Sequence, residues 1–338
     1  MPPLNLADLE LQLIDILSSQ GLPVEEIRLI GLLGKGTRAT VFSVMIDGVY
    51  HVLKVYDSNE SLRAELKNLK KVTPKDRFLF YWQNQPGDDL NINLAILEVP
   101  EGRELSSGLI TPSSAEWIAG RITELHSIRY RQRVSQSSLV QQLDRHKKPF
   151  LDHIVSLERD PAPYMKMLDN LKAMLIKSPD LFRANKVRLH GDFWWPNIVV
   201  AKEDVYFIDW ESVRRGDAAE DIAKLRVYIY GYRTPADPIF FWEQPSDGPR
   251  MGELVEAIAR RHQTQLGDDS LPERLKFYLP LFCIEELANR FMLPDAQVSM
   301  NKILADDALA LADDPFAAPP DLTKYGYFDE VQSLRING

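Results

Sequence analysis

The sequence predicts an α+β protein of two lobes, in which a small antiparallel sheet with one helix precedes a larger, mostly helical lobe. Two observations support this fold class. Between about residues 27 and 99, apolar residues occur in short, β-branched and alternating runs, which is the pattern of strands. After residue 103, apolar residues recur mostly at the three- and four-residue spacing of helices. The chain of 338 residues is long enough for both lobes.

The first lobe is assigned to residues 1–99. It begins with a predicted leading helix over 5–20, where Leu and Ile recur at helical spacing before a glycine. Asp47-Gly48 is typical of a hairpin turn between two strands, and a second helix is predicted over 59–72. The strands are expected at 27–33, 40–46, 49–56, 77–83 and 91–99.

A connector at residues 100–103 is expected to join this lobe to the second, which covers 104–338. Only residues 186–209 depart from the helical pattern, because two short apolar runs flank a polar loop there. The helices are expected at 113–128, in two or three segments within 138–178, and at 218–231, 249–266, 271–292 and 297–312.

The charge of the chain is acidic and unevenly distributed. The formal net charge of −9 argues against nucleic acid as a partner. Most of the excess lies in residues 241–338, which hold 9 basic and 17 acidic residues. This region is either a solvated acidic helical surface or, alternatively, a region that attracts a cationic substrate, with Glu285-Glu286 and Asp306-Asp307 as candidate contacts.

The single cysteine, Cys283, excludes a disulfide within the chain and a zinc site made of thiolates. The N-terminal stretch lacks the basic and apolar regions of a signal peptide. No apolar run approaches the ~20 residues that a membrane helix requires. We therefore expect a cytoplasmic protein without a membrane partner.

The residues with candidate catalytic chemistry are concentrated in and just after residues 186–209, the segment that departs from the helical pattern. His190-Gly191-Asp192-Phe193-Trp194-Trp195-Pro196-Asn197 is followed, after an apolar run, by Ile208-Asp209-Trp210-Glu211. Phosphoryl transfer requires a carboxylate that accepts the proton of the attacking hydroxyl, and oxygen ligands that hold Mg²⁺ at the nucleotide phosphates. The two aspartates and the asparagine of these stretches offer such groups at one loop-strand edge.

These stretches, together with Gly216-Asp217-Ala218-Ala219-Glu220-Asp221-Ile222-Ala223, resemble the aminoglycoside phosphotransferase and choline kinase family, whose members share the bilobal protein-kinase-like fold. The resemblance implies ATP and Mg²⁺ as cofactors. It also implies that Asp192 is the catalytic base, that Asn197 and Asp209 are Mg²⁺ ligands, and that Glu211 lies near the metal and phosphates.

The same resemblance implies supporting roles for two residues of this region. His190 would be a structural hydrogen-bonding residue behind the loop, and Asp221 would brace the catalytic loop, residues 190–197. One position departs from the family pattern: the proline that usually stands three residues after the catalytic aspartate is replaced by Trp195. Trp194 and Trp195 are candidate substrate-lining residues, because their loop would border the acceptor hydroxyl, and packing in the core is the alternative for both. Glu211 is a further candidate substrate-lining residue.

The first lobe contains a glycine-bearing turn between two predicted strands, with Gly34 and Gly36 as candidate nucleotide-binding positions. Glycines there let backbone N–H groups approach phosphate oxygens. Ala39 stands where the family has a third glycine, so the motif is incomplete, and a bare hairpin turn is an alternative.

Lys54 lies in the middle of an apolar strand, where a lysine either snorkels at an edge or is held by a partner. The resemblance makes it the lysine that binds the α- and β-phosphates, paired with a glutamate on the following helix. Glu65 is the first candidate for that partner and Glu60 the reserve, the alternative being that Glu65 faces solvent. The connector resembles an interlobe hinge, which places Glu98 and Val99 at the adenine.

A small-molecule acceptor is expected because only 12 residues separate Asp209 from Asp221, too few for the peptide-binding activation segment of a protein kinase. A hydroxyl of an aminoglycoside-like compound, an amino alcohol or a sugar would receive the phosphate. A nucleotide-binding pseudokinase or ligand sensor is the alternative, although Lys54, Asp192 and both proposed metal ligands are present. His126 is interpreted as a packing residue.

Overall fold

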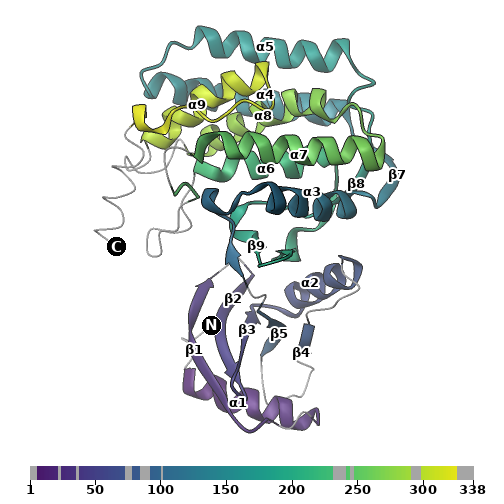
Figure 1. Cartoon of the computed structure of the whole chain (residues 1–338), viewed down its shortest axis with the longest axis vertical. Coiled ribbons are helices and arrows are strands. Elements are labelled where there is room, and N and C mark those ends of the chain that lie inside the picture. The colour runs from purple at the N-terminus through teal and green to yellow at the C-terminus, as the bar shows by residue number, and fades with distance from the viewer. Residues whose placement is uncertain are drawn as a thin grey trace. The chain divides into compact units, whose positions relative to one another are not determined.

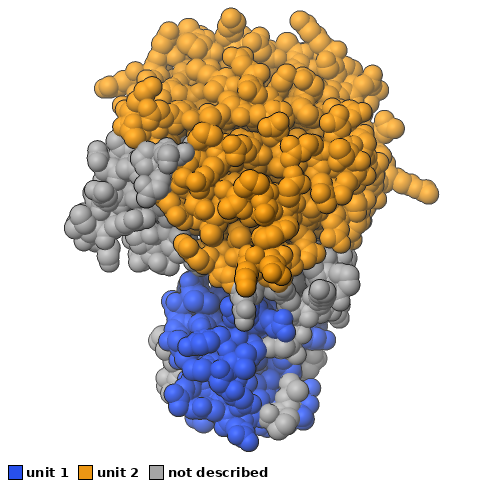
Figure 2. All heavy atoms as spheres, viewed as in Figure 1, with its two compact units in different colours: residues 1–101 blue, residues 102–338 orange. Residues whose placement is uncertain are grey.

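The computed structural model of the chain describes residues 6–21, 24–35, 38–72, 78–83, 92–99, 102–230, 241–243, 247–290 and 298–325. Its contacts divide the chain into two compact units, residues 1–101 and 102–338 (Figure 2). The predicted α+β class is confirmed, with an antiparallel sheet in the first unit and mostly helices in the second (Figure 1). Within these described ranges, no helix has the length and apolar character needed to cross a bilayer.

The first unit is a five-stranded antiparallel sheet in the order β1-β2-β3-β5-β4, with two helices. Its elements are α1 (Leu6–Ser19), β1 (Ile27–Lys35), β2 (Ala39–Ile46), β3 (Val49–Tyr56), α2 (Asn59–Val72), β4 (Phe78–Trp82) and β5 (Asn93–Glu98). Each predicted element of this lobe is present, with ends that differ by a few residues. The β2–β3 hairpin turns at Asp47 and Gly48, both of which have positive φ.

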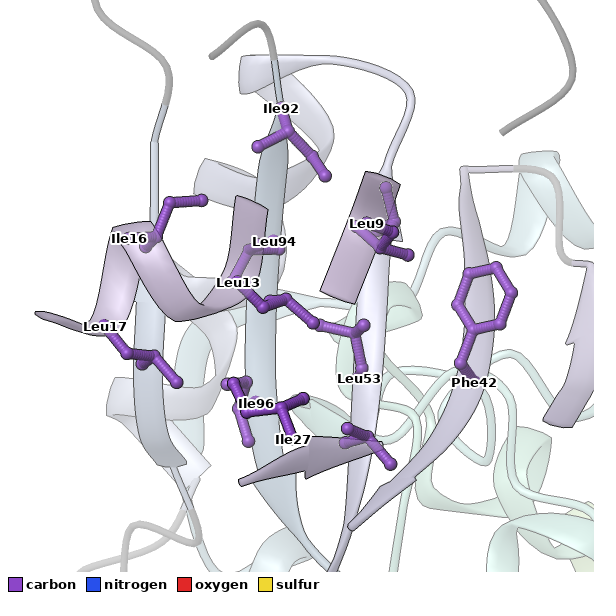
Figure 3. Close-up of a cluster of buried hydrophobic side chains, with 12 residues drawn as sticks. Leu9, Leu13, Ile16, Leu17, Ile27, Phe42, Leu53, Ile92, Leu94 and Ile96 are labelled. Carbon is purple, nitrogen blue, oxygen red and sulfur yellow. The ribbon is translucent and has the colours of Figure 1, made fainter. Parts of the chain in front are cut away.

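Successive side chains of β3 point to opposite faces of the sheet, one of which packs against α1 and the other against α2. Leu53 and Val55 belong to the core that includes one face of α1, with Leu13 at its centre (Figure 3). Tyr56 has the opposite parity and packs with Leu62 of α2 in a second, smaller cluster. Because Lys54 is two residues from Tyr56, it points to the α2 side of the sheet.

The second unit contains seven α-helices among its described residues, together with two small antiparallel sheets of order β10-β9-β6 and β11-β8-β7. The helices are α3 (Pro112–His126), α4 (Gln136–Ser156), α5 (Ala162–Lys177), α6 (Ala218–Val227), α7 (Gly248–Leu266), α8 (Leu271–Arg290) and α9 (Val298–Asp313). The strands are β6 (Arg103–Glu104), β7 (Arg129–Arg133), β8 (Asn185–Leu189), β9 (Ile198–Val200), β10 (Val205–Phe207) and β11 (Arg214–Gly216).

The sheet of β7, β8 and β11 was not predicted as a sheet. The sequence of β7 is Arg-Tyr-Arg-Gln-Arg, and only Tyr130 is not exposed in it, so the strand has no apolar alternation to detect. Its pairing with β8 depends on the placement of α3 and on residues that follow almost sixty positions later. The sheet matters for the site because β8 leads directly into His190 and β11 follows the segment of Asp209.

Candidate functional site

In the first unit, a buried lysine–carboxylate pair lies on the α2 side of the sheet. Lys54 Nζ donates to Glu65 Oε1 at 2.9 Å, and the hydroxyl of Tyr56 donates to Glu65 Oε2 at 2.7 Å. Because both carboxylate oxygens are bound by donors, Glu65 holds the ammonium in a defined position. Glu65 lies three residues after Leu62 and therefore on the same, inward face of α2. The predicted pair is formed with Glu65, and the reserve Glu60 lies in the first turn of that helix.

The other first-unit candidates lie at the ends of strands or outside the described residues. Gly34 lies in β1 opposite Val41, with open space where a Cβ would be. Gly36 lies outside the described residues, as do the first two positions of the connector. Glu98 ends β5 and Val99 follows it, both exposed. Their contacts with phosphate and adenine therefore stay predictions.

In the second unit, the predicted base and metal ligands converge on one end of the β9–β10 hairpin. Phe207 of β10 pairs with Ile198 of β9, so Asn197 precedes one strand and Asp209 closely follows the other. The amide of Ile208 donates to the carbonyl of Asn197 at 3.0 Å, which extends the ladder to this end. Asp192 lies there too, because Asn197 Nδ2 donates to its Oδ2 at 3.0 Å and to its carbonyl oxygen at 2.9 Å.

The hydrogen bonds of Asn197 determine which of its atoms can serve a cation. Both bonds to Asp192 use the amide nitrogen of Asn197, so its amide oxygen faces away from Asp192. Asn197 is buried, whereas Asp209 is half-buried and has φ 62° and ψ 70°. That left-handed conformation costs energy in a residue with a Cβ, although aspartate tolerates it better than most. Strain retained at such a position is typical of functional sites. Glu211, two residues on, is half-buried.

Helix α6 holds the loop that contains Asp192. The helix begins at a capping box, in which Asp217 accepts from the amide of Ala219 and Glu220 accepts from the amide of Asp217. Asp221, in the first turn, accepts from the backbone amides of His190 at 2.8 Å and Gly191 at 3.0 Å. These two bonds are the contacts that a brace of the catalytic loop requires.

Asp221 is completely inside the protein. Burial by itself raises the pKa of its carboxyl, but the hydrogen bond and charge interaction with His126, together with His190 and the Gly191 amide, hold the pKa below its usual value. The carboxylate is therefore ionised and accepts from the His126 Nε2, 3.1 Å away.

This contact corrects the interpretation of His126 as a packing residue. Besides binding Asp221, its Nδ1 lies 2.8 Å from Nε2 of His262 on α7. The His262 ring also contacts Thr123 Oγ1 at 3.0 Å. Burial, followed by repulsion from His126, lowers the pKa of His262 to about 3. The sequence could not show this chain of contacts, because α3 and α7 are brought together only by the fold.

His190 and Gly191 shape the entrance of the loop. His190 Nε2 donates to the carbonyl of Ile208 at 3.0 Å, which ties the loop to the segment that precedes Asp209. Burial lowers the pKa of His190, against the attraction of nearby carboxylates, so the ring is neutral. Gly191 has φ 79°, and a Cβ there would collide with the carbonyl of Ser212. Only glycine fits this position.

One charged residue at the site was missed from the sequence. Lys224, on α6, has its Nζ 2.6 Å from Asp192 Oδ1 and donates to the carbonyl of Gly191 at 3.2 Å. A signal for it existed. Lys224 lies three residues after Asp221 on a predicted helix, and therefore on the face that had already been assigned to the catalytic loop.

The two tryptophans of the loop differ. Trp195 is completely buried, and its Nε1 donates to the carbonyl of Tyr228 at 3.2 Å. The expectation that Trp195 lines a substrate is therefore wrong for this structure, because its ring fills the interior. Trp194 is half-buried and packs edge-on against the Tyr228 ring. For Trp194 the substrate contact stays a prediction.

Two adjacent acidic residues of α9, Asp306 and Asp307, form ion pairs within the protein. Asp307 is fully buried in a two-bond pair with Arg226, and Asp306 binds Arg159 at 2.7 Å. Asp307 is thus unable to attract a cationic substrate, as one interpretation had it, because its charge is already matched in the interior. Glu285 accepts from Gln142, and burial raises the pKa of its carboxyl.

Comparison with known proteins gives one family and a set of solved structures. The model of the phosphotransferase enzyme family matches residues 3–241. No curated protein matches the sequence. Aminoglycoside phosphotransferase APH(4)-Ia has a TM-score of 0.54 at 15% identity, over 91% of this chain and 99% of its own. Spectinomycin phosphotransferase APH(9)-Ia, solved with ADP and spectinomycin, has a TM-score of 0.53 at 13% identity, over 98% of this chain and 99% of its own.

A third similar structure is a thermostable mutant of APH(4)-Ia in a ternary complex with ADP and hygromycin B. Its TM-score is 0.52 at 15% identity, over 90% of this chain and 98% of that chain. At these identities the structures show a shared fold.

Proposed function

The chain belongs to the phosphotransferase enzyme family, and from that premise we propose that it transfers the γ-phosphate of ATP to a hydroxyl group of a small molecule. The observation that supports this most is at one end of the β9–β10 hairpin, where Asn197 binds Asp192 and Asp209 follows the paired strand. Phosphoryl transfer leaves little covalent work to the protein, so a positioned base and oxygen ligands are the main requirements.

The donor set at this end of the hairpin fits Mg²⁺. The ion prefers oxygen ligands, and the Asn197 amide oxygen and Asp209 carboxylate are both oxygen donors. When bound, Mg²⁺ supplies positive charge that neutralises the phosphates and orients them. We assign the metal to these two residues and place Glu211 in the same neighbourhood.

The residues of the chain act on the proton and on the phosphates. Asp192 accepts the proton of the acceptor hydroxyl as that oxygen bonds to the γ-phosphorus, and the bond from the γ-phosphorus to the bridging oxygen breaks to release ADP. Asn197 holds the Asp192 carboxylate from one side. Lys54, fixed by Glu65, offers an ammonium for the α- and β-phosphates.

The acceptor class is proposed from the family and from a feature of the sequence. Similar solved structures contain hygromycin B or spectinomycin as bound small molecules. The segment from Asp209 to Asp221 forms a single 3₁₀ turn and the short strand β11 before α6 begins. It therefore lacks the length of a peptide platform. An aminoglycoside-like compound, an amino alcohol or a sugar is the acceptor that we propose.

A screen of acceptors tests this function. The purified full chain is mixed with Mg²⁺-ATP and, in turn, with hygromycin B, spectinomycin, gentamicin, choline, homoserine and simple sugars, and ADP release is followed. We expect at least one acceptor to stimulate ADP release and to gain the mass of one phosphoryl group, and we expect chelation of Mg²⁺ to abolish both.

The matched control is Asp209→Ala, which removes a proposed metal ligand. If the wild-type chain binds ATP yet releases no more ADP than this variant with any acceptor, the transfer activity is rejected. That result would instead favour a nucleotide-binding protein without catalysis.

A further inference from the structure

Lys224 is the one ammonium that the described part of the chain places on the Asp192 side chain. Its Nζ lies 2.6 Å from Asp192 Oδ1, and neither side chain is fully buried. The same ammonium donates to the carbonyl of Gly191, one residue before. A lysine ammonium has three donors, so it can hold the backbone and the carboxylate together. None of the roles assigned above uses this residue.

The contacts of Asp192 show what the lysine does to it. Oδ1 is bound by Lys224 and Oδ2 by the amide nitrogen of Asn197 at 3.0 Å. A carboxylate bound on both oxygens cannot rotate about its terminal torsion without losing one of the two bonds. Each oxygen keeps a further lone pair, so the group remains able to accept a proton.

Helix α6 determines the position of the lysine. Asp221 and Lys224 are three residues apart and therefore lie on one face of the helix. The first binds the amides of His190 and Gly191, and the second binds the Gly191 carbonyl and the Asp192 carboxylate. The Tyr228 ring lies one turn on, with its centroid 5.4 Å from the ammonium, and limits the directions that the lysine can take.

We propose that Lys224 is a positioning residue that fixes the Asp192 carboxylate, together with Asn197, in the orientation from which it accepts the acceptor proton. This inference rests on the proposed function. Lys224 itself neither gains nor loses a proton: the hydroxyl proton moves to Asp192, the acceptor oxygen bonds to the γ-phosphorus, and ADP leaves. Precise placement of a reacting group accounts for a large share of catalysis, so a misplaced base slows the chemical step more than it weakens binding.

The test compares Lys224→Met, which keeps an unbranched side chain one atom shorter and removes its charge, with the wild type. The substrates are Mg²⁺-ATP and the best acceptor of the screen, or water if no acceptor stimulates ADP release. We expect kcat to fall ~10–100-fold while KM for ATP changes less than about twofold. Lys202→Met is the matched control, because Lys202 is an exposed lysine at the opposite end of the β9–β10 hairpin, and its kcat should equal that of the wild type.

A double-mutant cycle separates positioning of Asp192 from a general structural effect. The second background is Asp192→Asn, in which the rate of transfer is measured by single-turnover formation of labelled product. There, Lys224→Met should lower this rate less than about twofold, because the group that it positions can no longer accept the proton. A loss as large as that in the wild-type background would contradict the proposal. Unchanged kcat in Lys224→Met would contradict it as well.

If Lys224→Met fails to fold, Lys224→Gln replaces it, since the amide can still donate to Asp192 without charge. The expected kcat then lies between those of the wild type and of a chain without the contact, and a wild-type value would overturn the inference. The outcome also separates the two proposals. An inactive wild-type chain that binds Mg²⁺-ATP rejects both, whereas an active wild type with an equally active Lys224→Met rejects only the role of Lys224.

Discussion

Each unit of the molecule holds a lysine–carboxylate pair at its candidate site. In the first unit the carboxylate supports the lysine, whereas in the second unit the lysine supports the carboxylate. In the first unit, the side chains of Lys54 and Glu65 are 11% and 2% exposed. In the second, those of Asp192 and Lys224 are 32% and 21% exposed. In both pairs, the more exposed member is the one that we propose to act on a substrate, and the more buried member holds it in place.

The difference between the pairs lies in which charge is presented. The lysine is presented in the first unit, where a negative phosphate is the expected ligand, and the carboxylate is presented in the second, where a proton must be accepted. In each case the supporting residue has a second attachment: Glu65 binds Tyr56, and Lys224 binds the Gly191 carbonyl. A supporting residue with two contacts cannot follow the presented group if that group moves.

Among the variants of the first pair, the larger effect is expected when the presented lysine is removed. Lys54→Met should lower kcat/KM for ATP ~100–1,000-fold, because a fixed positive charge is lost from the phosphates. Glu65→Gln should lower kcat/KM for ATP only ~10-fold, because it leaves the Lys54 ammonium present and only weakens its support. Steady-state kinetics measures both, with Lys67→Met, an exposed lysine on α2, as the unaffected control. Equal losses for Lys54→Met and Glu65→Gln would contradict the distinction between presented and supporting residues.

A smaller effect is expected on the free energy of unfolding, through His262, which lies behind the second pair. His262 is buried, and its pKa is lowered to about 3 by burial and by His126, with Asp268 and Arg274 acting in opposite directions. The unfolded state therefore binds a proton below pH ~6.5 that the folded state excludes. The free energy of unfolding should fall by up to ~1.4 kcal/mol per pH unit from this residue as pH decreases from about 6.5 toward about 3.

Urea denaturation at several pH values measures this dependence. His262→Gln should have a shallower loss of stability with acid than the wild type, because the group whose protonation differs between the folded and unfolded states is gone. An identical slope in the variant and the wild type would show that His262 is not the source of the acid sensitivity.

The first pair could be predicted from sequence because its signals are local. A lysine in an apolar strand is unusual, and a glutamate at helical spacing from Leu62 is the natural partner. The strands and the two helices of this unit were predicted from the same alternation and periodicity. Local patterns of this kind need no knowledge of how distant segments meet.

The second pair and its surroundings could be predicted only in part. The spacing from Asp192 to Asn197 and Asp209 was visible in the sequence. However, Lys224, the partner of Asp192, comes from α6, and the histidines behind Asp221 come from α3 and α7, which are placed by tertiary packing. His126 and His262 therefore had no detectable connection. Trp195 was misassigned because an aromatic residue in a polar loop has the same sequence signature whether it faces solvent or fills the core.

The central claim is that Asp192 accepts the proton of the acceptor hydroxyl. Its most direct test is Asp192→Asn, which preserves the shape of the side chain and removes the proton-accepting oxygen. Phosphate transfer and the Kd for Mg²⁺-ATP are measured on the same preparation. We predict that transfer falls ~100–10,000-fold while the Kd changes less than about threefold. Transfer that stays within about threefold of the wild-type rate, with nucleotide binding intact, would show that another group takes the proton.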